Sequence, residues 1–348
     1  MCTMLSVAVV GFRALPRFCS LRKISTPSIQ IFDRKAKRLQ RIRSARRENA
    51  TVYDYLRDEV AFRLADRVLD IKRTFEVAVD LGCGRGHLSQ HLTSDAVNFL
   101  YQCDSCLDIL KQAKPSPDVE TMSLNIDEES LPFQENSINL FLSCLGLHWV
   151  NDMPGTFSQV LRSLKPDGCF LGVTFGMDTL FELRVALQLA EMERLGGFYP
   201  HVSPFIDSAR LGDLLQEAGF NLITLDVDEL VVHYPSMFEL TEDLRGMGES
   251  NAVVSRPLRL NRDVLTASAA IYDERFGEPR ENGKEGERCV PATFRLLYFI
   301  AWKPDPSQIK PLPRGSAEYS FKELSRLDEL GASHVAKTNQ GSSKDNEK

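Results

Sequence analysis

Long hydrophobic runs are missing from this sequence. No stretch reaches the roughly 18 uninterrupted apolar residues that a membrane-spanning helix needs, and the run from Met4 to Val10 is far too short. We therefore expect a soluble protein. With 348 residues and 43% hydrophobic content, the chain is long enough for one large α/β domain or two smaller ones.

Cysteine is scarce as well. The eight cysteines do not form a disulfide framework in a chain of this size, and most lie in apolar stretches, as small buried side chains of a reducing compartment do. Cys103 and Cys106 form a single Cys-x-x-Cys pair, which is weak evidence for zinc because zinc usually takes four ligands. We favour a structural or incidental role for the pair and predict no metal site.

Acidic side chains are absent from the first thirty residues, which carry Arg13, Arg17, Arg22 and Lys23 among several serines. This composition is typical of a mitochondrial transit peptide, which we predict at about 1–30. A secretory signal usually places positive charge before its apolar core, whereas Met1 to Val10 holds no basic side chain. A disordered basic tail is the alternative.

Charge of one sign dominates each part of the chain. Residues 1–50 hold twelve Lys or Arg and two acids, and because the whole chain carries −6, residues 51–348 carry −16. A body this acidic repels nucleic-acid backbones, so no nucleic-acid partner is expected.

The basic residues concentrate in 34–47, within a segment (31–50) that we predict to be a basic helical arm. Apolar residues recur there at every third position and predict a narrow apolar stripe: Ala36, Leu39, Ile42 and Ala45. Such a helix could lie on the anionic inner-membrane surface or dock on an acidic partner. The alternative is a solvated helical arm.

From Phe75 onward, strand and helix patterns alternate, which implies a parallel sheet within a domain spanning 51–305. Seven strands are predicted: Phe75–Leu81, Asn98–Cys103, Glu120–Asn125, Ser137–Leu145, Cys169–Phe175, Asn221–Val232 and Thr293–Trp302.

A helical insertion at 234–291 lies between the last two predicted strands. It holds two helical patterns, Met237–Met247 and Arg262–Phe276, and a polar exposed loop at Glu278–Arg288. Thr179 and Glu182 are spaced as a capping box that opens a helix. The polar tail, 306–348, is predicted to be disordered.

The strongest motif is a glycine-rich turn that follows an apolar strand. Asp80 ends the strand, and Gly82, Gly84 and Gly86 follow at every second position, before a predicted helix. A dinucleotide-binding turn needs its third glycine where this chain has His87. A carboxylate beside the turn suits a ligand with a positively charged amino-acid end. The pattern therefore predicts S-adenosylmethionine as the cofactor.

Two further acids end the next strands. Asp104 closes the second strand 24 residues after Asp80, where an acid can bind ribose hydroxyls. Asp127 follows the third strand, where its carboxylate could accept from the adenine amino group. Either acid alone could be a solvated loop carboxylate. In register with the glycine turn, they predict an adenosine site.

These acids, the glycine turn and the segment Leu131-Pro132-Phe133 resemble the class I methyltransferase superfamily. The resemblance implies a Rossmann-like α/β fold with a seven-stranded, mostly parallel sheet and helices on both faces. Three segments between about residues 32 and 302 resemble the mitochondrial respiratory complex I assembly factor 5 family: Leu145–Asp152, Phe175–Arg184 and Met247–Asn251. The chain is more distantly similar to the biotin-pathway enzyme that methylates a malonyl-carrier protein.

The family resemblance implies a protein on the matrix side of the mitochondrial inner membrane, working with other assembly factors. It implies hydroxylation of an arginine of a complex I core subunit at an early assembly step. An iron(II) oxygenase needs two histidines and a carboxylate at one site, and the six histidines include no His-x-Asp or His-x-Glu. His87 and His91 could share a helix face, although a polar face explains them.

Two other functions stay open. One is an ordinary S-adenosylmethionine-dependent methyltransferase that acts on a protein side chain or a carrier-bound acid. The other is a non-catalytic assembly chaperone whose pocket binds the cofactor for stability.

Five residues are candidates for chemistry near the carboxyl edge of the sheet, where such folds place substrates. We predict His148 and Asp178 as catalytic residues and Trp149, Glu182 and Glu249 as substrate-binding residues. His148 could orient or deprotonate a substrate group, and Trp149 could stack on a guanidinium or on the cofactor. The three carboxylates could pair with a target arginine, because two carboxylate oxygens match the guanidinium. Packing of His148 and Trp149 and helix capping by Asp178 are the alternatives.

Overall fold

The computed structural model describes residues 30–280 and 287–308 of the chain. Residues 1–29 of the predicted transit peptide and residues 309–348 of the predicted tail lie outside these ranges. No helix of the described ranges is long and apolar enough to cross a membrane. Every element described below belongs to the compact unit that ends at Asp305.

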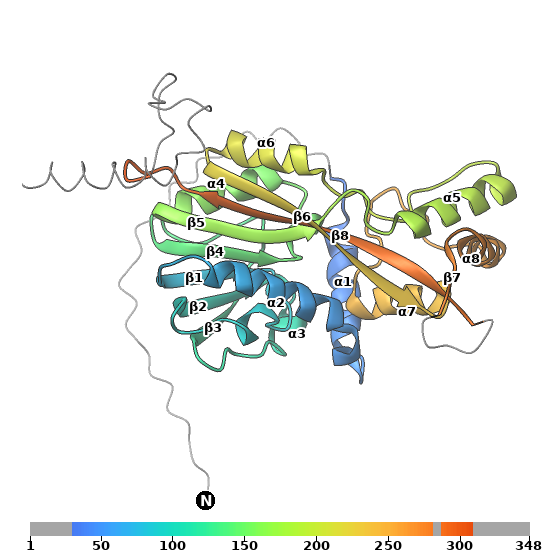
Figure 1. Cartoon of the computed structure of the whole chain (residues 1–348), viewed down its shortest axis with the longest axis horizontal. Helices are drawn as coiled ribbons and strands as arrows, with labels where there is room; N and C mark the ends of the chain where they lie inside the picture. The colour runs from blue at the N-terminus through green and yellow to red at the C-terminus, as the bar shows by residue number, and fades with distance from the viewer. Residues whose placement is uncertain (1–29, 281–286, 309–348) are drawn as a thin grey trace, which may run out of the picture. The chain divides into compact units, whose positions relative to one another are not determined.

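A mixed β-sheet forms the centre of this unit, with its strands in the order β3-β2-β1-β4-β5-β8-β6 (Figure 1). β1 to β5 pair in parallel, and β8 is antiparallel to β5 and β6. The bounds are β1 (Phe75–Leu81), β2 (Val97–Asp104), β3 (Glu120–Asn125), β4 (Ile138–Cys144), β5 (Leu164–Phe175), β6 (Asn221–Tyr234) and β8 (Arg288–Trp302).

The predicted α/β class I methyltransferase fold is confirmed, and each predicted strand overlaps one of these seven. β5 and β8 begin earlier than predicted, and a two-residue strand, β7 (Glu278–Pro279), pairs with β8 and gives the described sheet an eighth member. The central strands are rich in Val, Leu and Phe because strands with both faces covered are buried on both sides.

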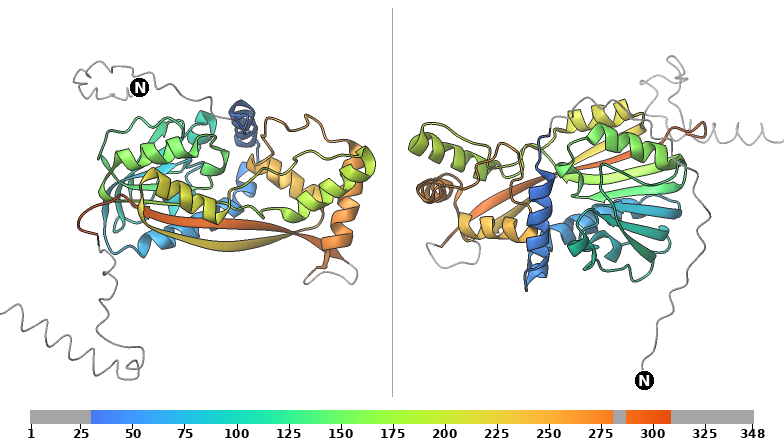
Figure 2. Two further views of the ribbon diagram at one scale, coloured as in Figure 1. Left: turned by 90° about the horizontal axis from the view of Figure 1, so that it is seen from above. Right: turned by 180° about the vertical axis from the view of Figure 1, so that it is seen from behind.

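Helices cover the sheet on both faces (Figure 2). α2 (Tyr55–Leu69) packs on one face, and α4 (Met153–Ser163) and α6 (Ser208–Ala218) pack on the other. Successive residues of β1 point to opposite faces. Ala78 therefore belongs to the core under α2, and Val79 to the core under α4 and α6.

A second group of helices stands beyond the carboxyl ends of the parallel strands (Figure 1). The long antiparallel pair β6–β8 reaches this group, which comprises α5 (Phe181–Leu195), α7 (Met237–Met247) and α8 (Arg262–Phe276). The bounds predicted for the two insertion helices are confirmed. The predicted exposed loop is wrong at its ends, because Pro279 pairs with Arg288 as β7 meets β8; residues 281–286 lie outside the described ranges.

Two predicted helix starts are wrong. The glycine turn leads into turns and a single 3-10 turn, η2 (Leu88–Gln90), instead of a helix. Thr179 and Glu182 do not form a capping box: the Thr179 hydroxyl donates to the backbone oxygen of Arg295 at 3.1 Å, and Glu182 accepts from Thr293. Both partners lie on β8, so a neighbouring strand takes the side chains that the local pattern assigned to a helix end.

The basic segment forms α1 (Arg34–Ala45), which runs past the carboxyl ends of the strands, between the sheet and α7 (Figure 2). A short 3-10 turn, η1 (Ala50–Tyr53), links it to α2. α1 buries Lys37, Ser44 and Ala45, and the last of these belongs to the predicted apolar stripe, whereas Leu39 of the stripe is 53% exposed. The interpretation as a solvated arm is wrong, because a mostly polar face of α1 is buried against its own chain.

Candidate functional site

The turn after β1 is a tight bend whose three glycines all have positive φ, and Gly86 has no room for a Cβ. Gly82, Gly84 and Gly86 have φ of +78°, +59° and +77°, a region that residues with a Cβ rarely adopt. A Cβ on Gly86 would lie 2.8 Å from Gln102 Nε2 and 2.9 Å from the backbone nitrogen of Lys114. The spacing of the three glycines is therefore a requirement of the backbone.

Asp80 is a buried acid without a partner. Its side chain is fully buried, and neither carboxylate oxygen has a hydrogen-bond partner among the described residues. Burial, with a smaller contribution from Asp104, raises the pKa of Asp80 to about 8. Buried polar groups without partners are costly, so this carboxylate suits a cationic group that would supply the missing hydrogen bonds.

Asp104, at the end of β2, is buried and accepts hydrogen bonds through both carboxylate oxygens. Its Oδ1 accepts from the backbone N–H of Cys106 at 2.7 Å, and Oδ2 accepts from Gly84 N–H at 3.1 Å. Arg41 of α1 donates to the same Oδ2 at 2.6 Å. The acid predicted to bind ribose thus touches the glycine turn, and it also holds the basic helix in place.

The third predicted cofactor acid belongs to a small acidic group. Arg34 of α1 donates to Asp127 at 2.8 Å and to Glu128 at 2.6 Å, and it pairs with Glu129 at 3.0 Å. Asp127 is half exposed, whereas Glu128 is buried. Burial and the charge of Asp104 raise the pKa of Glu128.

α1 and the strand ends enclose a first cavity of about 330 Å³, within the usual range for a small-molecule site. Asp127, Glu128 and Gly146 line it, with Arg34 and Lys37 on the side of α1. The glycine turn lies one layer deeper, because a Cβ on Gly82 would meet Gly146 Cα at 3.1 Å. α1 therefore covers the predicted cofactor residues.

Glu249, just beyond α7, is the centre of a buried charged cluster. It pairs with Arg57 of α2, accepts from Trp149 Nε1 at 2.6 Å, and lies 3.2 Å from His148 Nε2 and 3.8 Å from Lys37 Nζ. These cations and the hydrogen bond from His148 outweigh desolvation and hold the pKa of Glu249 well below its usual value. His148 and Trp149, which were predicted as site residues separately from Glu249, thus both contact the Glu249 carboxylate.

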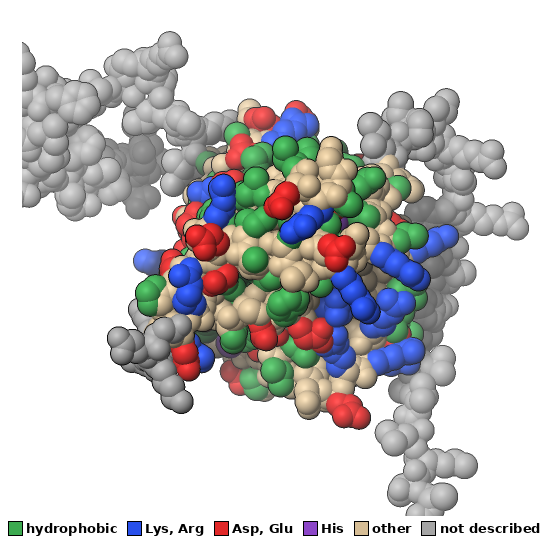
Figure 3. Space-filling model, turned by 90° about the vertical axis from the view of Figure 1, so that its right-hand side faces the viewer, with side chains coloured by type: hydrophobic (Ala, Val, Ile, Leu, Met, Phe, Trp, Pro, Cys, Tyr) green, Lys and Arg blue, Asp and Glu red, His purple; other side chains and the backbone are tan. Residues whose placement is uncertain are grey.

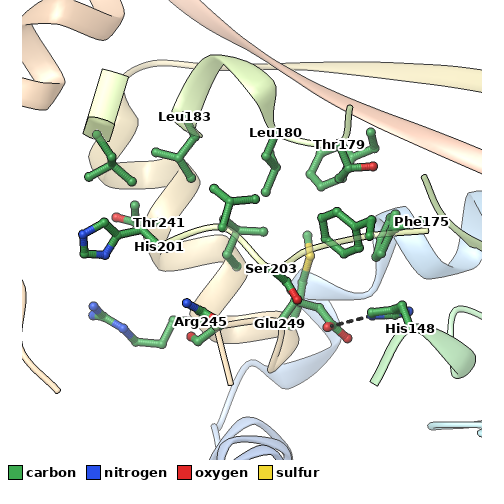
Figure 4. A pocket seen from close by; sticks show the side chains of 18 of the residues that line it. His148, Phe175, Thr179, Leu180, Leu183, His201, Ser203, Thr241, Arg245 and Glu249 are labelled. Atoms are coloured by element: carbon green, nitrogen blue, oxygen red, sulfur yellow. Dashed lines mark hydrogen bonds and ion pairs between the residues drawn. The ribbon is translucent and has the colours of Figure 1, made fainter. Parts of the chain in front are cut away.

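A second cavity, of about 200 Å³ and mostly apolar, begins on the other side of Glu249 (Figure 4). Burial lowers the pKa of His148, so its imidazole is neutral and its Nε2–H donates to Glu249. The other ring nitrogen, Nδ1, is buried without a hydrogen-bond partner among the described residues, as is the Ser203 hydroxyl. Figure 4 shows His148, Ser203 and Glu249 gathered at one end of this cavity.

The structure does not bring the other two candidate carboxylates to this site. Asp178 is 54% exposed and pairs with Arg295 of β8. Glu182 is buried and accepts from the hydroxyl and backbone N–H of Thr293. Neither lines the two cavities, so the expectation that they meet a target arginine is not supported by their positions. Both tie α5 and the segment before it to β8.

Several residues of the site escaped sequence reasoning. The density of Arg and Lys in α1 predicted a helix. It did not predict that Arg34 and Arg41 reach acids of the cofactor site or that Lys37 reaches Glu249. Glu128 adjoins Asp127 but has no distinguishing pattern. Ser203 follows α5 in an irregular segment with no motif. The residues that were missed are Arg34, Lys37, Arg41, Arg57, Glu128 and Ser203.

The strand order, the antiparallel β8 and the glycine bend after β1 together define a protein of the class I methyltransferase fold. A family described as "Methyltransferase domain" matches residues 79–172, which cover β1 to most of β5.

Two relatives resemble the chain over nearly its whole length. "Arginine-hydroxylase NDUFAF5, mitochondrial" of Danio rerio is 47% identical over 327 residues, which cover 94% of this chain and 99% of that protein. The Homo sapiens protein of the same name is 48% identical over 322 residues, covering 92% and 91%. A "Malonyl-[acyl-carrier protein] O-methyltransferase" of Methylovorus sp. (strain MP688) is 32% identical over 295 residues, covering 81% and 94%.

The chain therefore belongs to the family of the mitochondrial arginine-hydroxylases NDUFAF5. The relatives are named as mitochondrial, in agreement with the location predicted from the N-terminal composition.

Proposed function

We propose that this chain is a protein-arginine hydroxylase. It acts on a complex I core subunit at an early assembly step, on the matrix side of the mitochondrial inner membrane, together with other assembly factors. Family membership supports this function, since relatives that carry the name arginine-hydroxylase match 94% and 92% of the chain.

α1 is the surface proposed for peripheral contact with the inner membrane. Three exposed basic side chains of α1 and one at its C-cap could contribute: Lys35, Arg38, Arg43 and Arg46. Lys and Arg side chains also gather along one side of the face in Figure 3. Anionic lipids attract such a surface. Sedimentation with anionic vesicles tests this contact, and equal binding to neutral vesicles would argue against it.

The cofactor of the proposed function is S-adenosylmethionine. The observation that carries this proposal is the carboxylate of Asp80, buried without a hydrogen-bond partner among the described residues, beside a bend of three glycines with positive φ. When bound, S-adenosylmethionine supplies a positively charged sulfonium with an electrophilic methyl group and an ammonium at its amino-acid end. Asp80 would hold the amino-acid end, Asp104 the ribose hydroxyls and Asp127 the adenine amino group.

Calorimetry tests the cofactor assignment. Asp104→Ala should weaken the binding of S-adenosylmethionine by about 1–3 kcal/mol, the typical cost of leaving hydrogen-bonding groups without partners. Asp108→Ala, which removes an exposed acid from α3 (Leu107–Leu110) nearby, is the matched control and should leave the affinity unchanged. Equal affinities of the wild type and Asp104→Ala would remove Asp104 from the site.

The second cavity suits the side chain of a target arginine. Its apolar walls match the methylene groups, and Glu249 and Trp149 match the guanidinium by charge and by stacking. His148 Nδ1 can accept one of the guanidinium N–H groups, because Nε2 carries the proton. Hydroxylation also consumes an oxidant. Within the described ranges, no group of three or more His, Cys, Asp or Glu side chains is placed to hold a metal ion.

Methyl transfer is the second candidate function. It is favoured by the match of residues 79–172 to a methyltransferase domain and by the 32% identity to an O-methyltransferase. The acceptor would be a protein side chain or a carrier-bound acid.

Mass spectrometry of complex I core subunits, made with and without this protein, separates the candidates. Hydroxylation adds the mass of one oxygen atom to an arginine peptide, whereas methylation adds the mass of one CH2 group. A CH2 adduct that forms only when this protein is present, with no oxygen adduct, would overturn hydroxylation. A double variant, Asp80→Ala with Gly82→Ala, tests the third candidate function, a non-catalytic assembly chaperone. If complex I still assembles when this variant no longer binds the cofactor, both enzymatic functions fail.

A further inference from the structure

Lys37 lies in a binding site for a cation. Its side chain is 6% exposed, and its Nζ donates to the backbone oxygens of Gly248 at 3.0 Å and Ser250 at 2.8 Å. The same nitrogen lies 3.3 Å from the centre of the Trp149 ring and 3.8 Å from Glu249 Oε2. We name the site formed by these four residues, Trp149, Gly248, Glu249 and Ser250, the cation seat.

The chemistry of the cation seat is not specific to lysine. A carboxylate, two carbonyl oxygens and an aromatic face accept N–H groups and positive charge from an ammonium or a guanidinium. The planar guanidinium stacks on aromatic rings and offers more donors in fixed directions than an ammonium does. An arginine side chain can therefore use every group that Lys37 uses.

The cation seat lies between the two cavities. Trp149 and Glu249 line both of them, and Lys37 lines the cavity beside the predicted cofactor acids. The apolar cavity, at about 200 Å³, is many times larger than the roughly 10–15 Å³ that holds one water molecule. An arginine side chain has seven non-hydrogen atoms beyond Cα. An arginine that enters through the apolar cavity would thus carry its guanidinium to the edge of the cofactor cavity.

Lys37 and a second cation cannot share the cation seat. Glu249 already pairs with Arg57, so a guanidinium beside protonated Lys37 would place three buried cations around one carboxylate. Uncompensated buried charge is strongly unfavourable. Burial lowers the pKa of Lys37 to about 7 despite the nearby Glu249, so its ammonium is held less firmly than an ordinary lysine charge.

We propose that the cation seat binds the guanidinium of the target arginine and that Lys37 occupies it as a pseudosubstrate. α1 must then withdraw Lys37 before substrate binds. The inference rests on the proposed function in one respect, the identity of the substrate as an arginine side chain. It goes further by assigning a binding site and a competitor within the same chain.

The test compares variants of the full chain in binding N-acetyl-L-arginine methylamide, measured by calorimetry without turnover. Lys37→Met removes the competing cation and should lower the Kd about tenfold. Lys37→Gln, which keeps a donor for the two carbonyl oxygens, should act in the same direction. Arg43→Met makes the same charge change on the exposed side of α1 and should leave the Kd within about twofold of the wild type.

Two further measurements define the binding site. Glu249→Gln should weaken binding of the arginine probe, and the neutral citrulline analogue should bind no variant measurably. Thermal unfolding checks that each variant is folded, and if Lys37→Met is not, Lys37→Gln decides. Unchanged or weaker probe binding in a folded Lys37 variant overturns the proposal.

The outcomes separate this inference from the proposed function. If Lys37→Met binds the arginine probe more tightly but no oxygen adduct forms on any subunit, the cation seat stands and hydroxylation fails. If the adduct forms and Lys37→Met does not tighten binding, hydroxylation stands and the pseudosubstrate is wrong. If only S-adenosylmethionine gains affinity in Lys37→Met, the cation seat belongs to the cofactor and the proposal is overturned.

Discussion

The glycine bend and α1 meet at the same site but are specified in different ways. The bend follows from local requirements: three positive φ values and contacts with Gln102 and Lys114 that exclude a Cβ. α1 is held by distant acids, since Arg34 pairs with residues 127–129, Arg41 with Asp104, and Lys37 with Glu249. A local requirement can be recognised in the sequence, whereas a docking partner 63 to 213 residues away cannot.

Gly86→Ala is the sharpest test of the bend. The new Cβ would press on the Lys114 backbone at a φ of +77°, so we expect a loss of about 3 kcal/mol or more in unfolding free energy. Urea unfolding measures this change. Gly197→Ala is the control, because a Cβ there meets nothing within 4 Å and should change stability by less than about 0.5 kcal/mol. If Gly86→Ala loses no more unfolding free energy than Gly197→Ala, the bend tolerates a side chain.

Arg41→Ala tests whether α1 depends on its polar contacts. Removing the guanidinium leaves Asp104 buried without its cation, and we expect a loss of about 2–3 kcal/mol. Hydrogen exchange should show α1 opening before the sheet. Arg46→Ala removes a charge from a pair that is 72% and 39% exposed and should cost less than about 0.5 kcal/mol. If both variants behave alike, α1 is held by apolar packing after all.

Asp80→Asn should stabilise the ligand-free protein, in a pH-dependent way. Burial raises the pKa of Asp80 from 3.8 to about 8, so the folded state binds this proton more tightly than the unfolded state. Its contribution to stability is present below pH 4 and is lost as pH rises toward 8. The variant lacks this loss, so its stability advantage over the wild type should grow by up to about 1.4 kcal/mol per pH unit between pH 5 and pH 8. Parallel stability curves from pH 5 to pH 8 would contradict the assignment.

Much of the fold was predictable because the sheet repeats simple patterns. Apolar runs identified the seven main strands, and apolar periodicity identified α7 and α8. Asp80, Asp104 and Asp127 could be placed at one edge of the sheet, since parallel strands bring their carboxyl ends together. His148, Trp149 and Glu249 do meet, although no pattern predicted that they share a hydrogen-bonded cluster with Lys37 and Arg57.

Two of the wrong predictions, the capping box and the buried face of α1, share one physical cause. Thr179 and Glu182 have the spacing of a capping box, yet their side chains bond to β8, which is more than 100 residues further along the chain. The predicted apolar stripe is buried at Ala45 but exposed at Leu39, and α1 buries Lys37 beside it. In each case a long-range partner offers more hydrogen bonds or charge than the local pattern does.

By itself, the sequence determined where the strands lie in the chain, the glycine bend and the acids beside it. These features depend on backbone sterics and on residues that are adjacent in the chain. Only the tertiary structure decided that α1 covers the cofactor acids and that Lys37 lies against Trp149 and Glu249. A buried charge is stable only where the folded chain gathers its partners. The charged cluster around Glu249 joins four separate segments of the sequence, which contribute Lys37, Arg57, His148 with Trp149, and Glu249 itself.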